Sequence, residues 1–137
     1  MIEILLLAGL LHLALLLCHG TYIALTHGIG WGMGRRSNQP NLTDLDRRFE
    51  RTIANSTEGM IAFVPIGLAA FLLGNDANMI LLAAQVFVAA RLLFAVLYLS
   101  NIPYIRTVVW LAGVASTLAI GVSTLTLALR EFPLSVF

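Results

Sequence analysis

Long apolar stretches separated by short polar segments make up most of this chain. Four stretches are long enough to cross a membrane as helices, because a helical span needs about 20 residues. They run from Ile2 to Thr26, from Thr43 to Leu73, from Ala77 to Ser100 and from Tyr104 to Leu129. In the second stretch the first turns are polar, so we expect its membrane-buried part to begin near Asn55.

The segments between the stretches have the composition of loops and turns. Gly28 to Leu42 is rich in Gly, Arg and Asn, and Thr43-Asp44-Leu45-Asp46 after it has the capping hydroxyl and early acids typical of a helix start. Gly74-Asn75-Asp76 and Asn101-Ile102-Pro103 are short turns, which make successive helices antiparallel. The pattern predicts an all-α, up-down four-helix bundle, a single domain over residues 1–137.

Composition indicates whether this bundle is surrounded by water or by lipid. The chain is 59% hydrophobic and only 11% charged, whereas about a quarter of the residues in a soluble domain are charged. We therefore expect an integral membrane protein in contact with the lipid bilayer. The net charge of +1 gives no reason to expect a nucleic-acid partner.

The first stretch resembles a signal peptide only in part. Glu3 stands where a signal peptide carries positive charge, and the apolar stretch continues past Cys18. We expect an uncleaved first span. Since Cys18 is the single cysteine, no disulfide within the chain is expected.

All eight basic residues are arginines, and their distribution predicts an orientation. Six flank the turns on one side of the membrane: Arg35, Arg36, Arg47, Arg48, Arg51 and Arg106. The positive-inside rule places this side in the cytoplasm and both termini outside. The short loops favour a bacterial inner membrane, with the endoplasmic reticulum or another organelle membrane as the alternative.

Polar residues within the spans are the candidates for chemistry. Arg48, Arg51, Asn55 and Glu58 have the spacing of one face of the second helix. Ionisable groups at membrane depth are costly, so they usually face a bundle interior or a wet cavity.

The third and fourth helices add further polar groups. Arg91 interrupts the third apolar stretch, Tyr98 shares its face two turns later, and Arg106 follows across the Pro103 turn. We expect these groups to form a basic, partly buried cavity on the arginine-rich side. Arg51 and Arg106 would pair well with an anionic ligand there. Glu58 and Arg91 are also expected to form a structural ion pair between the second and third helices.

The order of these residues resembles the MAPEG family, membrane-associated proteins of eicosanoid and glutathione metabolism. The resemblance rests on Arg51-x-x-x-Asn55-x-x-Glu58, then Ala90-Arg91 and Tyr98, then Pro103 and Arg106, and covers nearly the whole chain. It implies a homotrimer of four-helix subunits. It also implies that glutathione binds between neighbouring subunits near the cytoplasmic side, as a cosubstrate.

The resemblance implies a role for each matching residue. Arg51 would pair with a glutathione carboxylate, with Arg48 beside it. Asn55 and Glu58 would bind the γ-glutamyl end, and Tyr98 would hydrogen-bond the tripeptide. The catalytic residue would be Arg106, which stabilises the thiolate, because a nearby cation lowers the pKa of a thiol. A lipophilic small molecule would arrive from the bilayer as the electrophile.

The chain departs from the family pattern at several positions. Thr26-His27 stand where glutathione-using members often carry an Arg, and Gly59 follows Glu58 where an aromatic or polar residue is frequent. Phe94 replaces a common His or Tyr, and Pro65 comes about a turn late.

Three histidines and a stripe of small residues complete the candidates. His12 and His19 share a face of the first helix, where we expect packed or interface histidines; no motif completes a metal site. His27 could replace the missing Arg of the first helix. In the fourth helix Gly113, Thr117 and Gly121 recur every four residues, a spacing that permits close helix packing in lipid.

The leading functional hypothesis is a glutathione-dependent transferase or peroxidase acting on lipophilic electrophiles. One alternative is a non-catalytic lipid-binding or scaffold protein of the same fold. Another is a small transport or channel subunit that uses the buried polar residues as a path. The transferase hypothesis requires thiol binding that depends on Arg51 and Arg106. The lipid-binding hypothesis requires that lipid retention does not depend on Arg106, and the transport hypothesis requires flux across a bilayer.

Overall fold

The computed structural model describes residues 1–34 and 42–132, and the predicted helices are present in them. The long helices are α1 (Ile2–His27), α3 (Asp44–Leu72), α4 (Asn78–Leu99) and α5 (Ile105–Glu131). Each is long and apolar enough to cross a membrane, which confirms the four expected spans. Their ends differ from the predicted ends by no more than one or two residues. The protein is an integral membrane protein.

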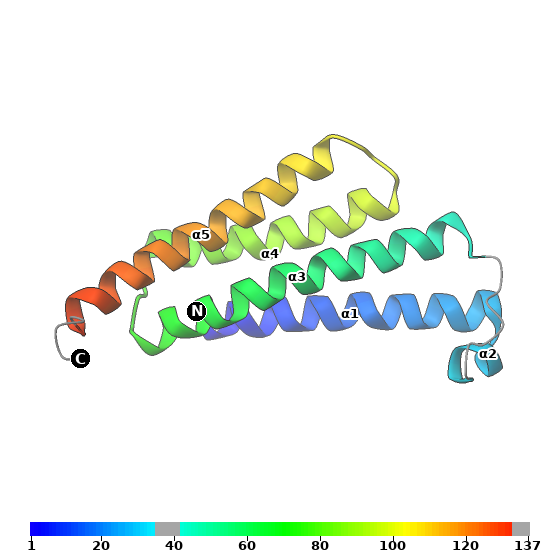
Figure 1. The fold of residues 1–137 in the computed structure, drawn as a ribbon, viewed down its shortest axis with the longest axis horizontal. Coiled ribbons are helices and arrows are strands. Elements are labelled where there is room, and N and C mark those ends of the chain that lie inside the picture. The colour runs from blue at the N-terminus through cyan, green and yellow to red at the C-terminus, as the bar shows by residue number, and fades with distance from the viewer. Residues whose placement is uncertain (35–41, 133–137) are drawn as a thin grey trace.

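The four long helices form an antiparallel up-down bundle, as predicted (Figure 1). Helix α3 contacts each of the other three, and α4 packs along α5 over most of its length. The start of α1 and the end of α5 lie at one end of the bundle. At the other end α3 and α5 begin and α4 ends (Figure 1), so Arg47, Arg48, Arg51 and Arg106 lie there. We call it the arginine-rich end.

Helix α3 begins as the sequence predicts. The Thr43 hydroxyl accepts a hydrogen bond from the backbone N–H of Asp46 at 3.1 Å, and the Asp46 carboxylate accepts one from the Thr43 N–H at 2.7 Å. This reciprocal capping box satisfies two N–H groups that would otherwise lack partners. The helix then continues without interruption through Pro65.

A short helix, α2 (Ile29–Met33), forms where a loop was expected. Gly28, at φ +86°, separates it from α1 in a left-handed conformation that favours glycine. The ring of Trp31 packs against His27 with 5.3 Å between ring centroids. This contact stabilises a turn whose two glycines favour a loop by propensity. The predicted loop residues Arg35 and Arg36 lie outside the described residues.

The apolar core lies further along α3 from the arginine-rich end than the polar residues Arg48, Arg51, Asn55 and Glu58. Phe63 of α3 stacks on Phe87 of α4 with 3.8 Å between ring centroids, and both side chains are buried. Ala8 of α1 and Ile120 of α5 complete the same cluster. The core therefore ties together all four spans.

The small-residue face of α5 packs against its neighbours, as its spacing predicted. Gly113 and Thr117 are buried, and a Cβ at Gly121 would stand 3.6 Å from Ile66 of α3. Near the opposite end the Asn75 amide donates to Ser123 and Thr124 of α5, each at 3.2 Å. These contacts hold α5 across both α3 and α4.

Candidate functional site

A basic cavity of about 300 Å³ opens at the arginine-rich end, between α3, α4 and α5. We call it the arginine cavity. Its lining brings together Asp44, Arg47, Arg48, Arg51, Tyr98, Asn101 and Arg106. Four of the predicted site residues, Arg48, Arg51, Tyr98 and Arg106, thus converge from three helices, whereas Asn55, Glu58 and Arg91 do not line this cavity.

Contacts between helices hold these side chains in place. The Arg48 guanidinium donates to the backbone carbonyl of Leu99 at 3.2 Å, which ties α3 to the end of α4. The Arg106 guanidinium lies over the Tyr98 ring, with 4.6 Å from Cζ to the ring centroid. Tyr98 in turn packs against Phe94 at 5.5 Å. Phe94 thus supports the tyrosine by packing.

Positive charge in the arginine cavity exceeds negative charge. Its acid, Asp44, accepts a hydrogen bond from Arg47 at 2.8 Å, and both side chains are exposed. Across the described ranges, no salt bridge involves Arg48, Arg51 or Arg106. Guanidinium groups bind carboxylates and phosphates through paired hydrogen bonds. The arginine cavity is therefore suited to an anionic ligand.

A second cavity of about 270 Å³ follows on the next turns of α3. We call it the Arg91 cavity. It is largely apolar, with Ala62 and Ile66 of α3 facing Trp110, Val114 and Leu118 of α5. Asn55, Glu58 and Arg91 are its polar groups. Its lining begins about one helical turn beyond that of the arginine cavity, at Asn55 after Arg51 and at Trp110 after Arg106.

The predicted ion pair between Glu58 and Arg91 is wrong. The Arg91 Nη1 group donates instead to Asn55 Oδ1 at 3.1 Å, and no salt bridge joins it to Glu58 in the described chain. Glu58 is exposed, whereas Arg91 retains 6% of its surface. Successive residues are about 100° apart around a helix, so Arg91 reaches α3 at Gly59 and Glu58 points to one side.

Arg91 also lines a third cavity, of about 200 Å³, on the other side of α4. Leu11, Leu15 and Cys18 of α1 form one wall of this cavity, and Ser56 of α3 borders it. The same guanidinium-bearing side chain therefore borders a cavity toward α1 and the Arg91 cavity toward α5.

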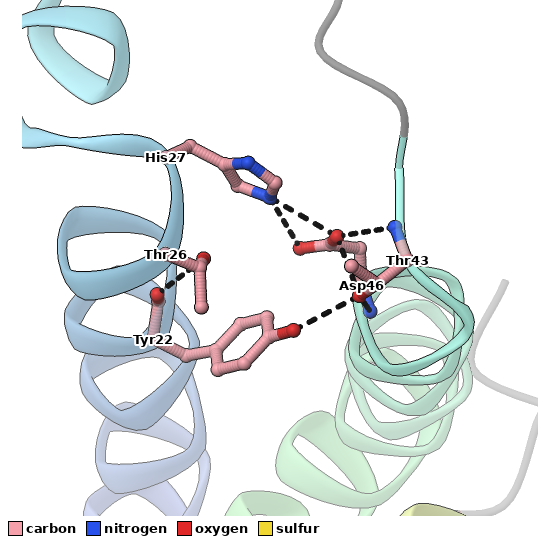
Figure 2. Close-up of polar contacts among 5 residues, drawn as sticks. All are labelled: Tyr22, Thr26, His27, Thr43 and Asp46. Atoms are coloured by element: carbon pink, nitrogen blue, oxygen red, sulfur yellow. Dashed lines mark hydrogen bonds and ion pairs between the residues drawn. The ribbon is translucent and has the colours of Figure 1, made fainter.

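Sequence reasoning missed a polar cluster that joins the end of α1 to the start of α3 (Figure 2). His27 Nε2 lies 3.1 and 3.2 Å from the two carboxylate oxygens of Asp46, whose side chain is buried. The Tyr22 hydroxyl lies 2.9 Å from the Thr43 hydroxyl. His27 is thus engaged with Asp46, and it does not line the arginine cavity as a substitute for an arginine would. The capping box was the sequence feature that could have indicated this cluster. It uses Oδ2 of the Asp46 carboxylate, so Oδ1 remains to accept a hydrogen bond from another group.

The other two histidines pack against α3, as expected from their shared face. His12 Nδ1 lies 3.0 Å from the Ser56 hydroxyl, and the His19 ring stacks on Phe49 at 5.2 Å. Within residues 1–34 and 42–132, no cluster of three or more His, Cys, Asp or Glu side chains is placed to hold a metal ion.

The model of the MAPEG family matches residues 2–126, which include every residue of the two cavities. No curated protein matches the chain, and neither does any solved structure.

Proposed function

The chain belongs to the MAPEG family, and on that basis we propose that it is a glutathione-dependent transferase or peroxidase acting on lipophilic electrophiles. One observation carries the proposal: Arg48, Arg51, Tyr98 and Arg106 converge on one cavity, and an apolar cavity begins about one turn further along α3 and α5. A polar thiol and an apolar electrophile could thus meet within one bundle.

Glutathione has the chemistry that the two cavities accept. In our proposal Arg51 binds one of its carboxylates, with Arg48 beside it, and Tyr98 hydrogen-bonds the tripeptide. Asn55 and Glu58, on the following turns of α3, bind the γ-glutamyl end. At the edge of a membrane a guanidinium and a carboxylate keep some hydration, which reduces the desolvation cost of pairing them.

Arg106 would supply the catalytic charge. The thiolate is the nucleophile, and a nearby cation increases its population by lowering the pKa of the thiol. Tyr98 holds Arg106 at the cavity through the cation–π contact. In the transferase reaction the sulfur forms a bond to an electrophilic carbon, and the displaced electron pair leaves with the leaving group.

We further propose that the protein is a homotrimer and that neighbouring subunits complete the site. Arg51 and Glu58 are exposed in the single chain, although they belong to a spanning helix. A charged group facing lipid is costly, so a second subunit that covers this side would be favourable. Mass measurement of the protein–detergent complex tests this assembly.

The arginine-rich end would face the cytoplasm, in a bacterial inner membrane. This orientation rests on the positive-inside rule, because Arg47, Arg48, Arg51 and Arg106 all lie at that end. Reporter fusions to the C-terminus test it. A fusion that is active only outside the cytoplasm supports the orientation, and one active only in the cytoplasm contradicts it.

Calorimetric titration of the detergent-purified protein with glutathione tests the proposed function. We expect micromolar to millimolar affinity for the wild type and loss of binding in Arg51→Ala. Arg130→Ala is the matched control, because Arg130 is an exposed arginine at the opposite end of α5. Absence of wild-type binding at millimolar glutathione, with the oligomer intact, would exclude the transferase hypothesis.

The apolar character of the Arg91 cavity favours a second candidate, a non-catalytic lipid-binding protein of the same fold. Ile66, Trp110 and Leu118 line that cavity without any contribution from Arg106. Lipid retained after purification would then be unchanged in Arg106→Ala. Mass spectrometry of co-purified lipid, compared between wild type and this variant, distinguishes the two candidates.

A further inference from the structure

Arg91 is held in a slot that two glycines create. A Cβ atom at Gly59 of α3 would stand 2.9 Å from Arg91 Nη1, and one at Gly113 of α5 would stand 2.6 Å from Nη2. Both separations are shorter than real Cβ contacts. The guanidinium is therefore inserted between α3 and α5 at the two positions where the side chain is a hydrogen atom.

Aromatic rings complete the slot from α4 itself. The Arg91 Cζ atom lies 5.2 Å from the centre of the Phe87 ring and 5.8 Å from that of Phe94. A cation over aromatic faces is stabilised where water is excluded. The guanidinium is therefore restrained by α3, by α5 and by two rings of its own helix, α4.

The contact between Arg91 and Asn55 fixes the direction of the Asn55 amide. A guanidinium offers only donors, so the group that faces it at 3.1 Å is the amide oxygen. The Asn55 Nδ2 group must then point away from Arg91. Asn55 and Glu58 both line the Arg91 cavity, so one ligand there could contact both side chains.

We propose that Arg91 is a positioning residue, which orients Asn55 so that Nδ2 donates a hydrogen bond to an acidic oxygen of the bound ligand. The inference rests on the proposed function in taking glutathione as that ligand. The acceptor is then the α-carboxylate of the γ-glutamyl group, and Glu58 binds the adjacent ammonium. Gly59 and Gly113 leave room for the guanidinium in this position, and a Cβ at either one would force it to shift.

Asn55→Asp tests the direction of the hydrogen bond. The new carboxylate keeps an acceptor for Arg91 but removes the Nδ2 donor and repels the ligand carboxylate. We expect glutathione to bind roughly tenfold or more weakly by calorimetry, because hydrogen bonds to charged groups are strong. The thermal midpoint of the unliganded variant should equal or exceed that of the wild type. Asn55→Leu, which leaves Arg91 without an acceptor, should lower the midpoint.

A glutathione analogue that lacks the α-carboxylate, 4-aminobutanoyl-cysteinyl-glycine, identifies the acceptor. We expect the wild type to bind this analogue more weakly than glutathione. Asn55→Asp should then cause no further loss, because the oxygen that accepts from Nδ2 is already absent. If Asn55→Asp reduced the affinity for glutathione and for the analogue equally, the α-carboxylate would not be the acceptor.

Gly113→Ala tests the slot, and Gly121→Ala is its matched control on the same helix. A Cβ at Gly121 meets only Ile66, at an ordinary 3.6 Å. Gly113→Ala should weaken glutathione binding as Asn55→Asp does, while Gly121→Ala should leave it unchanged. If Gly113→Ala bound glutathione as tightly as Gly121→Ala does, the role of the slot would be contradicted.

The outcomes separate this inference from the proposed function. Asn55→Asp that binds glutathione as tightly as the wild type would overturn the donor role of Asn55. Absence of binding by the wild type would overturn the proposed function and its ligand. In that case the thermal midpoints of the Asn55 variants still test the contact between Arg91 and Asn55. If Asn55→Asp and Asn55→Leu lowered the midpoint equally, that contact would be overturned.

Discussion

The guanidinium of Arg106 lies over the ring of Tyr98, with 4.6 Å between Cζ and the ring centroid. This contact joins the last turn of α4 to the first turn of α5 across the connection that contains Pro103. It places the charge of Arg106 in the arginine cavity without using its hydrogen-bond donors. Those donors therefore remain available to an anion.

Tyr98→Leu should slow glutathione conjugation by roughly two- to fivefold, which corresponds to loss of an exposed cation–π contact. The reason is that Arg106 is no longer held over the cavity. Tyr98→Phe keeps the ring, so it should weaken glutathione binding while leaving the pKa of the bound thiol unchanged. The absorbance of the thiolate as a function of pH, measured on bound glutathione, checks this difference. Equal thiol pKa values in the two variants would contradict it.

Glutathione binding should weaken as salt concentration rises. The arginine cavity is open to water, and exposed charges are screened over about 10 Å at 0.1 M salt. Titrations at increasing sodium chloride should show a falling affinity in the wild type. Arg51→Ala, titrated with enough glutathione to detect residual binding, should show a shallower dependence. A salt-independent affinity would mean that the arginines do not bind the ligand carboxylates.

Asp46→Ala should destabilise the fold by roughly 2 kcal/mol, because it removes the capping box of α3 and leaves His27 without its carboxylate partner. Thermal unfolding followed by circular dichroism in detergent measures the effect. Asp44→Ala is the matched control, since Asp44 is exposed and pairs only with exposed Arg47. We expect it to change the midpoint little. A comparable fall in both variants would show that the cluster of Figure 2 adds nothing to stability.

Phe63→Ala should cost about 3–5 kcal/mol, because it opens a cavity in the stacked pair with Phe87. Phe71→Ala on the same helix is the control, since Phe71 is 40% exposed and lies outside the core cluster. The midpoint of thermal unfolding of each variant gives the comparison. Similar midpoints for the two variants would place the core elsewhere.

Much of the fold could be predicted because a membrane limits the choices. Apolar stretches of the right length specify the spans, and the two short turns specify antiparallel neighbours. The spacing of Arg48 and Arg51 on α3, with Arg106 at the start of α5, was enough to predict a shared cavity. These features depend on local sequence, which periodicity describes well.

Partners between helices could not be predicted, since they depend on how each helix is rotated and how closely it approaches its neighbours. Opposite charge suggested Glu58 as the partner of Arg91, but the open space at Gly59 and Gly113 admits the guanidinium beside Asn55. Charge complementarity was visible in the sequence, whereas the shape of the slot was not. The pairing of His27 with Asp46 likewise depends on where α1 ends relative to α3.

Among the described residues, Arg91 alone lines both the cavity toward α1 and the Arg91 cavity toward α5. Its side chain therefore lies between these two cavities in the interior of the bundle. A small residue at this position would enlarge both cavities, because the atoms it removes line each of them. The volume open to a ligand toward α1 and toward α5 is thus limited by the side chain of Arg91.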